Sequence, residues 1–245
     1  MNYLDLTLPT PEENLACDEA LLELCDEGLA GEVLRVWEYP RHFVVVGYAN
    51  EVGSEVNVPF CRQNGLPILR RCSGGGAVLQ GRGCLSYALV LRVDESGPLR
   101  GIGSTNRFVL ERHQAILEGL AQTPVQVRGH TDLALGALKF SGNSQRRKRR
   151  ALLFHGAFLI EFDLVLIERA LLMPSKQPDY RANRSHSDFL VNLRVPARDV
   201  ALALRRGWEA GTPLREIPLE RIRKLAREKY ATPEWTWRFD RGRGA

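Results

Sequence analysis

Apolar residues at helical spacing mark the first long helix of the chain. Thr10 is a suitable N-cap and Pro11 suits the first helical position, so the helix is expected to begin here and to run to about residue 27. Ala16 and Ala20 belong to its apolar stripe. Further helices are predicted at 104–121, 164–172, 197–209 and 219–230.

Short apolar runs bounded by glycine, proline or polar residues predict strands. They lie at 33–37, 43–46, 66–71, 86–93, 125–127, 132–135, 138–140 and 152–162. The first two are expected to pair with each other, the next two to continue their sheet, and the last two to form a hairpin. Because the strands cluster rather than alternate with helices, the fold class is α+β, with a mixed or antiparallel central sheet flanked by helices.

One later segment shows neither pattern. Residues 173–192 are polar, contain prolines and have no clear period, so no regular structure is expected there. A segment of this length without regular structure is often functional or covered by a partner.

Composition and charge narrow the class of protein. With 245 residues, 44% hydrophobic and 26% charged, the chain suits a soluble globular protein of one domain, or one domain and a small appendage. The net charge of +5 favours an acidic partner or a phosphorylated ligand. It is too small to indicate nucleic acid by itself, so nucleic-acid binding is not expected.

Five cysteines are present, at positions 17, 25, 61, 72 and 84. Their odd number and irregular spacing argue against a disulfide framework and against a zinc site. The first residues do not resemble a signal peptide, and no stretch reaches the roughly 20 apolar residues that span a bilayer. We therefore expect a reducing, cytoplasmic location and no membrane association.

A glycine triplet between two apolar stretches is the strongest candidate for a ligand site. Gly74, Gly75 and Gly76 follow Arg70 and Arg71 and precede Ala77. Without Cβ atoms, successive N–H groups can turn inward and form an anion-binding nest, and the arginines are expected to place positive charge at its mouth. The alternative is a tight turn with a bulge. The spacing matches neither the Rossmann nor the Walker motif.

A second candidate segment begins at Lys139 and continues with the small polar residues Ser141, Gly142 and Asn143. A lysine there could reach a phosphate or an activated carbonyl, whereas the alternative is a lysine on the solvent face of a strand. Asp132 could hold Mg²⁺ against phosphate oxygens or simply cap a turn. His155 could be a structural histidine or a base.

Five consecutive basic residues occupy positions 146–150, at the tip of the predicted hairpin. They could form a solvated turn or a docking patch for an acidic protein or a phosphate. Nucleic-acid binding is the weaker interpretation, because no aromatic residue is interleaved with them.

Together these segments resemble the lipoate–protein ligase and octanoyltransferase family, which shares its class II synthetase-like fold with biotin–protein ligases. The similarity covers most of the chain and is carried by residues 14–22, 44–50, 70–78, 129–133, 139–147 and 155–156. It implies one catalytic domain over residues 1–245, with a short helical extension at about 195–245. It implies no full accessory domain, so a separate accessory subunit is a possibility.

The resemblance also implies roles. Lys139 would be the catalytic residue that contacts the acyl carbonyl and the phosphate, and Asp132 would lie near the adenylate or a bound Mg²⁺. The remaining substrate- and nucleotide-binding positions would be Arg71, Ser73, Gly74, Gly75, Gly76, Ala77, Ser141, Gly142, Asn143 and His155. ATP and Mg²⁺ would be cofactors and lipoate a substrate. The acceptor would be a lysine on the lipoyl domain of a 2-oxoacid dehydrogenase or on the glycine cleavage H protein.

The sequence departs from the family pattern after the glycines. The ligase motif continues with His-Asp-x-Gly-Asn, whereas this chain has Gln80-Gly81-Arg82-Gly83-Cys84. The octanoyltransferase branches use a cysteine nucleophile in slots that correspond to the neighbourhoods of Thr131 and Ser175, and neither holds a cysteine here. Cys84 is the one candidate for an unusual nucleophile.

We therefore predict an ATP-dependent ligase that activates lipoate or octanoate as an acyl-adenylate. The alternatives are an ATP-independent transferase of octanoyl or lipoyl groups between carrier proteins and a non-catalytic lipoate-binding homologue.

Overall fold

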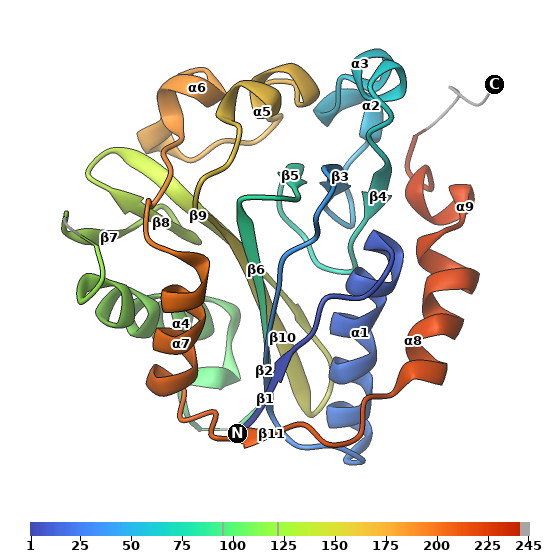
Figure 1. The fold of residues 1–245 in the computed structure, drawn as a ribbon, viewed down its shortest axis with the longest axis vertical. Coiled ribbons are helices and arrows are strands. Elements are labelled where there is room, and N and C mark those ends of the chain that lie inside the picture. The colour runs from blue at the N-terminus through green and yellow to red at the C-terminus, as the bar shows by residue number, and fades with distance from the viewer. Residues whose placement is uncertain (95, 122, 241–245) are drawn as a thin grey trace.

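A computed structural model describes residues 1–94, 96–121 and 123–240 of the chain. Its centre is a mixed sheet of eight strands in the order β11-β1-β2-β6-β10-β9-β8-β7 (Figure 1). The strands are β1 (Asn2–Asp5), β2 (Val33–Trp37), β6 (Cys84–Arg92), β7 (Val125–Arg128), β8 (Asp132–Leu135), β9 (Leu138–Arg147), β10 (Ala151–Leu159) and β11 (Thr212–Pro213). Strand β1 pairs in parallel with β2 and β11, and the other pairs are antiparallel. The predicted α+β class and the 138–162 hairpin are confirmed.

A second, smaller sheet lies beside the first, in the order β4-β3-β5. It consists of β3 (Phe43–Val46), β4 (Ile68–Arg70) and β5 (Val78–Gln80). The predicted pairing of 33–37 with 43–46 is therefore wrong. Strand β4 within 66–71 pairs with β3 in this small sheet, whereas β2 pairs with β6 in the large one, so the four segments do not form one sheet. Both edges of β2 are already occupied, by β1 and by β6, so β3 must find partners elsewhere.

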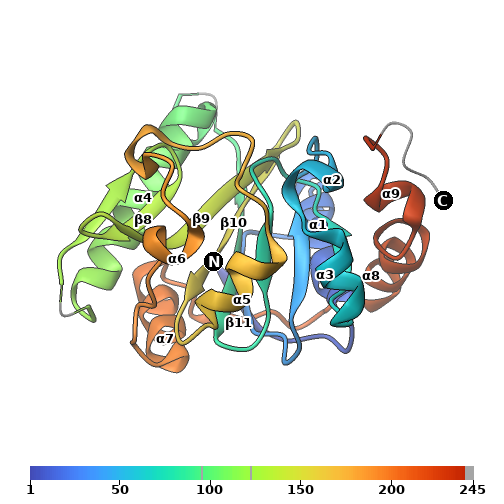
Figure 2. The same cartoon turned by 90° about the horizontal axis from the view of Figure 1, so that it is seen from above.

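Helices cover both faces of the large sheet (Figure 2). One face packs against α1 (Pro11–Glu27), and α8 (Leu219–Leu225) and η3 (Ala226–Tyr230) pack against α1 in turn. The other face is covered by α4 (Ile102–Glu118) and α7 (Ala197–Gly207). The Thr10 side chain accepts a hydrogen bond from Glu13 N, which confirms Thr10 as the N-cap of α1.

The remaining helical elements are short. They are α2 (Val52–Glu55), α3 (Val58–Gln63), η1 (Pro98–Arg100), α5 (Leu164–Ala170), η2 (Asp179–Arg181), α6 (His186–Phe189) and α9 (Pro233–Thr236). Because η2 and α6 lie within 173–192, the prediction of no regular structure there is wrong in part. Among the described residues, no helix combines the length and the apolar character needed to cross a bilayer.

Alternation along the central strands directs two sets of side chains to opposite faces. On β2, Val33 and Trp37 join the core under α1, whereas Leu34 and Val36 join the core under α4 and α7. Arg35 lies between them in sequence and shares the α1 face, where its guanidinium meets Asp18 of α1 at 2.6 Å. A charged pair is thus buried at the centre of an otherwise apolar layer.

Candidate functional site

The glycine loop connects β4 to β5, and Arg71 determines its shape. The Arg71 Nη2 group donates to the carbonyl oxygens of Gly74 at 2.5 Å and Gly76 at 2.9 Å. With the carbonyls held inward, the N–H groups of Gly74, Gly75 and Gly76 have no acceptor among the described residues. All three glycines are exposed. The loop therefore offers three adjacent donors that can bind an anion.

Gly47, at the end of β3, is what allows the loop to pack this closely. A Cβ atom at position 47 would lie 1.8 Å from the carbonyl oxygen of Gly75. Any larger residue would push the loop away from β3. The conformation of the glycine loop thus depends on its close packing against the end of β3 in the small sheet.

The two arginines before the glycines are buried, so the prediction that they place charge at the mouth of the loop is wrong. Arg70 is fully buried and donates to the carbonyl oxygens of Gly47, Tyr48 and Asn50 and to that of Thr236 in α9. Arg71 is 8% exposed, and burial lowers its pKa to about 10. Both guanidinium groups donate mainly to backbone carbonyl oxygens, and Arg71 Nε also donates to the Ser73 hydroxyl oxygen.

Lys139 and Asp132 come together on neighbouring strands. The Lys139 Nζ lies 2.7 Å from Asp132 Oδ1, and Tyr180 donates its hydroxyl to Asp132 Oδ2 at 2.8 Å. Gly142 makes room for the ammonium, because a Cβ atom there would lie 2.7 Å from Nζ. The Lys139 side chain is 25% exposed. The ammonium is therefore held in one place yet open to a ligand.

Asp132 as placed does not fit a magnesium ligand. Both of its carboxylate oxygens already bind protein donors, Lys139 and Tyr180. Within the part of the chain that the structure describes, no three His, Cys, Asp or Glu side chains form a group that could hold a metal ion. The carboxylate instead orients the lysine.

Ser141 and Asn143 lie next to this lysine on β9, but Asn143 is engaged with the protein. Its Nδ2 group donates to the carbonyl oxygen of Thr131 at 2.8 Å, and its Oδ1 accepts from the Tyr87 hydroxyl at 2.6 Å. Asn143 thus fixes the turn that precedes Asp132. The sequence does not single out Tyr87, because a tyrosine inside the apolar run of β6 is indistinguishable from a core residue.

His155 of β10 contacts the glycine loop from the protein interior, through the Ser73 side chain. The Ser73 hydroxyl lies 2.5 Å from His155 Nε2 and 2.8 Å from Ser144 Oγ. His155 Nδ1 in turn lies 3.5 Å from Asp18 Oδ2. Ser73 is 1% exposed, so its side chain lies beneath the loop rather than on its open side. Sequence patterns did not single out Asp18, a polar residue within helix α1.

The segment Gln80–Cys84, which departs from the family motif, connects β5 to β6. Gly83 N donates to Glu38 Oε1 at 2.7 Å, and the Gly83 carbonyl accepts from Ile160 and Glu161. Arg82 is exposed. The contacts of this connection are thus with β2 and with the end of β10, and they explain it as a corner between the two sheets.

All five cysteines are buried and unpaired. Desolvation raises the pKa of Cys17 and Cys61 to about 11 and that of Cys72 and Cys84 to about 12. A thiol needs its thiolate form to act as a nucleophile, so at neutral pH these cysteines are inert.

We expect native protein to react with Ellman's reagent very slowly at pH 7.5, because no thiol is both exposed and ionised. In denaturant, all five thiols should react at once. The measurement is the absorbance time course under the two conditions. One equivalent reacting rapidly in the native state would contradict this description.

The basic tip at 146–150 is largely paired within the molecule. Lys148 lies 3.1 Å from Glu23 of α1, Arg150 donates to the carbonyl oxygen of Asp26, and Arg147 donates to that of Leu99. The tip therefore fastens the hairpin to α1 and η1. Arg146 and Arg149 are exposed.

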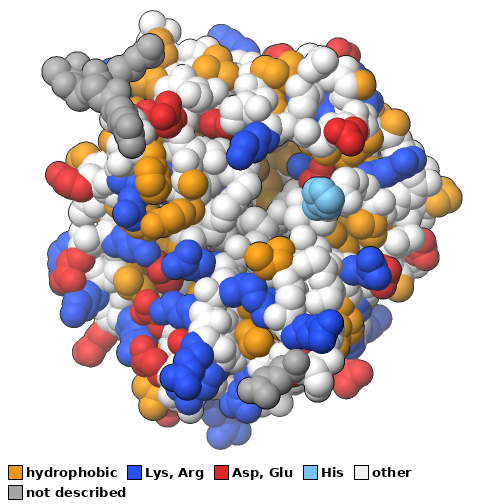
Figure 3. All heavy atoms as spheres, turned by 180° about the vertical axis from the view of Figure 1, so that it is seen from behind, with side chains coloured by type: hydrophobic (Ala, Val, Ile, Leu, Met, Phe, Trp, Pro, Cys, Tyr) orange, Lys and Arg blue, Asp and Glu red, His pale blue; other side chains and the backbone are white. Residues whose placement is uncertain are grey.

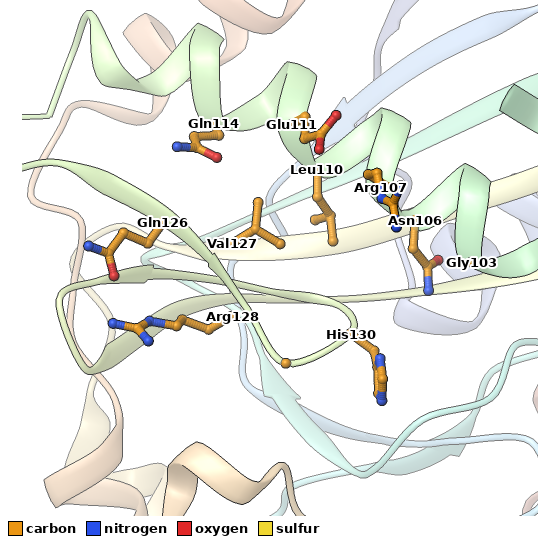
Figure 4. A pocket seen from close by; sticks show the side chains of 11 residues that line it. Gly103, Asn106, Arg107, Leu110, Glu111, Gln114, Gln126, Val127, Arg128 and His130 are labelled. Atoms are coloured by element: carbon orange, nitrogen blue, oxygen red, sulfur yellow. The ribbon is translucent and has the colours of Figure 1, made fainter.

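A groove of about 680 Å³ lies between α4 and the turn joining β7 to β8 (Figure 4). It is polar, and its charged or titratable lining residues are Arg107, Glu111, Arg128 and His130. Lys139 and the three glycines do not line it. The groove adjoins the lysine site through the 129–131 turn. Viewed from behind, the molecular surface is hollowed and carries many Lys and Arg side chains (Figure 3).

Known proteins similar to this chain include both ligases and transferases. A candidate lipoate-protein ligase A from Aeropyrum pernix is 34% identical over 247 residues, covering 93% of this chain and 89% of the relative. The octanoyltransferase LipM of Brevibacillus brevis is 25% identical, covering 96% and 98%.

Solved structures share the fold. A bi-partite lipoate protein ligase from Thermoplasma acidophilum, described with its E2 lipoyl domain, is 24% identical with a TM-score of 0.80 and 100% coverage of both chains. A lipoate-protein ligase A bound with ATP is 27% identical with a TM-score of 0.77, covering 98% of this chain and 100% of the other. The family model described as the lipoyl protein ligase A/B catalytic domain matches residues 10–202. With this match over most of its length, the chain belongs to the lipoyl protein ligase A/B family of lipoate ligases and octanoyltransferases.

Proposed function

We propose that this enzyme is an ATP-dependent lipoate–protein ligase. The carboxylate of lipoate or octanoate attacks the α-phosphorus of ATP, releases pyrophosphate and forms an acyl-adenylate. The amine of an acceptor lysine then attacks the acyl carbonyl, and AMP and a proton leave. The observation that carries the proposal is that the glycine loop, whose N–H groups have no acceptor among the described residues, contacts β9 through Ser73 and Ser144. Strand β9 also carries the held, partly open ammonium of Lys139.

Each part of this arrangement suits charge that develops during the reaction. Lys139, oriented by Asp132, would stabilise negative charge on the α-phosphate and on the acyl carbonyl oxygen. The N–H groups of Gly74, Gly75 and Gly76 would bind phosphate oxygens. By resemblance to the family, Ala77, Ser141 and Gly142 would also line the site that binds the acyl group and the nucleotide. Asp132 would orient Lys139 rather than bind Mg²⁺, because its two carboxylate oxygens accept from Lys139 and Tyr180.

The buried cysteines favour the ligase over the transferase. A transfer between carriers through a cysteine requires an exposed thiolate beside the lysine, whereas all five thiols here are buried. The 27%-identical ligase with bound ATP supports nucleotide use. The LipM relatives keep ATP-independent transfer as the second candidate.

Exchange of labelled pyrophosphate into ATP separates these two functions. A ligase should catalyse exchange that depends on lipoate or octanoate. A protein that shows no exchange, yet moves octanoyl groups from acyl carrier protein to an acceptor domain, would be a transferase. A protein that binds lipoate but does neither would be the non-catalytic homologue.

The partner would be a lipoyl domain or the H protein. The positive charge of this chain would favour an acidic acceptor domain. Residues 1–245 would act as one catalytic unit with its helical extension at about 195–245, and a separate accessory subunit would complete it, as the bi-partite T. acidophilum ligase suggests. Five unpaired cysteines are consistent with a cytoplasmic location.

Replacing Tyr180 by phenylalanine should weaken the orientation of Lys139. The change removes the hydroxyl that donates to Asp132 at 2.8 Å while keeping the ring. Loss of one hydrogen bond to a charged group should lower kcat/KM by about ten-fold, and should lower the free energy of unfolding by about 1–3 kcal/mol. Steady-state kinetics with an acceptor domain measure this, and an unchanged kcat/KM would show that Asp132 needs no second donor.

A further inference from the structure

A buried chain of hydrogen bonds runs from the centre of the sheet to the glycine loop. It begins at Arg35, passes through Asp18 and His155, and reaches Ser73. These residues come from β2, α1, β10 and the glycine loop, and none is more than 8% exposed. Four separate segments of sequence therefore meet in one polar line through the apolar core under α1.

Asp18 and a neutral His155 together determine the direction of the hydrogen bonds in this chain. As a carboxylate that also pairs with Arg35, Asp18 can only accept, so His155 must carry its proton on Nδ1. In a neutral imidazole with this proton on Nδ1, His155 Nε2 is an acceptor, and Ser73 donates its single proton to it. Ser144 and Arg71 Nε, at 2.8 and 3.1 Å, consequently donate to the Ser73 oxygen.

The chain ends on the group that shapes the loop. Besides donating to Ser73, Arg71 holds the carbonyl oxygens of Gly74 and Gly76 inward. A Ser73 hydroxyl that turned the other way would present its proton to Arg71 and repel it. Asp18 thus fixes the direction of the Ser73 hydroxyl, which lets Arg71 hold the loop carbonyls inward and leaves the loop N–H groups facing outward.

The same three residue types form the nucleophilic triad of many acyl-transfer enzymes. Here the Ser73 oxygen has three protein partners within 3.1 Å and is 1% exposed. The Ser73 oxygen therefore has its full set of hydrogen bonds and is closed to solvent. Such an oxygen can hold neighbouring groups in place but cannot attack a substrate as a nucleophile.

We propose that Asp18 and His155 are positioning residues, which act through Ser73 and Arg71 to hold the glycine loop in its ligand-binding shape. The proposal deepens the proposed function, and rests on it for the choice of ATP as ligand. Its effect on the loop itself is independent of any ligand.

The test compares His155→Gln with His155→Leu. Glutamine can still accept from Ser73, whereas leucine fills the space and cannot. We expect His155→Leu and Ser73→Ala to raise the KM for ATP by about ten-fold or more, and His155→Gln to stay within about three-fold of wild type. If His155 merely fills space, leucine should be the milder change.

Two further measurements complete the test. The Ser73→Ala, His155→Leu double variant should be no worse than either single variant, since both break one chain. In the ligand-free protein, the Tyr48 amide, which donates to the Ser73 carbonyl at 2.8 Å, should exchange its hydrogen faster in these variants than in His155→Gln. The exposed Ser96→Ala is the matched control.

Three results would overturn the proposal: leucine tolerated as well as glutamine, effects of the two single changes that multiply, or covalent labelling of Ser73 by a fluorophosphonate. If the wild-type protein does not bind ATP, the proposed function is wrong, and the Tyr48 exchange rates then test the positioning role by themselves. Asp18→Asn should have the same effects as His155→Leu. If Asp18→Asn does not fold, the comparison of His155→Gln with His155→Leu remains the test of the positioning role.

Discussion

Replacing Lys139 by alanine is expected to lower the rate of acyl transfer by about 10²–10³-fold, the usual cost of removing one positioned group that stabilises developing charge. The ammonium lies 2.7 Å from Asp132, is held over Gly142 and remains 25% exposed. No other lysine or arginine side chain of the described site combines an oriented charge with this access. Single-turnover transfer to an acceptor domain measures the effect.

The matched control is Lys176→Ala, a change at an exposed lysine in the loop before η2. It should leave transfer unchanged. Lys139→Met keeps most of the aliphatic part of the side chain but loses the charge. It should be nearly as slow as Lys139→Ala, because the reaction depends on the charge of Lys139 and not on its packing. If Lys139→Ala retained the wild-type rate, the assignment of Lys139 as the catalytic residue would be wrong.

Replacing Arg70 by alanine is expected to destabilise the fold by about 3–5 kcal/mol. The guanidinium is fully buried, and its loss strands the carbonyl oxygens of Gly47, Tyr48, Asn50 and Thr236 without a donor. For a chain of this size, the melting temperature should fall by roughly 6–20 °C. Thermal unfolding followed by circular dichroism measures it.

Arg149→Ala is the control for this change, since Arg149 is exposed at the tip of the β9–β10 hairpin. It should alter the free energy of unfolding by less than about 0.5 kcal/mol. Equal effects of the two changes would mean that the Arg70 contacts do not hold α9 against the turn at residues 47–50.

Local signals in the sequence were sufficient for the elements that depend on neighbouring residues. The cap at Thr10 and the hairpin around 146–150 follow from short-range chemistry, and both are confirmed. Lys139 and Asp132 were singled out together, and their contact follows from the pairing of β8 with β9. Their chemical roles remain predictions.

Long-range features were not predictable in the same way. Whether β3 pairs with β2 depends on β1, which was not anticipated as a strand and which occupies the edge of β2. Arg70 and Arg71 look like ligand-binding residues in sequence, yet most of their partners are backbone carbonyls, including one from α9 that is 166 residues away. Carbonyl acceptors leave no trace in a sequence.

Asp18 and Tyr180 illustrate the same limit. Asp18 lies within a helix whose pattern predicts packing, and Tyr180 lies in the segment where no regular structure was expected. Asp18 becomes informative through its contacts with Arg35 and His155, and Tyr180 through its contact with Asp132. Such contacts join segments that only the folded chain brings together.

The most direct test of the account is a crystal structure of the protein soaked with lipoate and ATP. We expect an acyl-adenylate whose phosphate lies within hydrogen-bond distance of Lys139 Nζ and of the N–H groups of Gly74–Gly76. Intact ATP and lipoate far from Lys139, or an acyl group attached to a protein side chain, would contradict it.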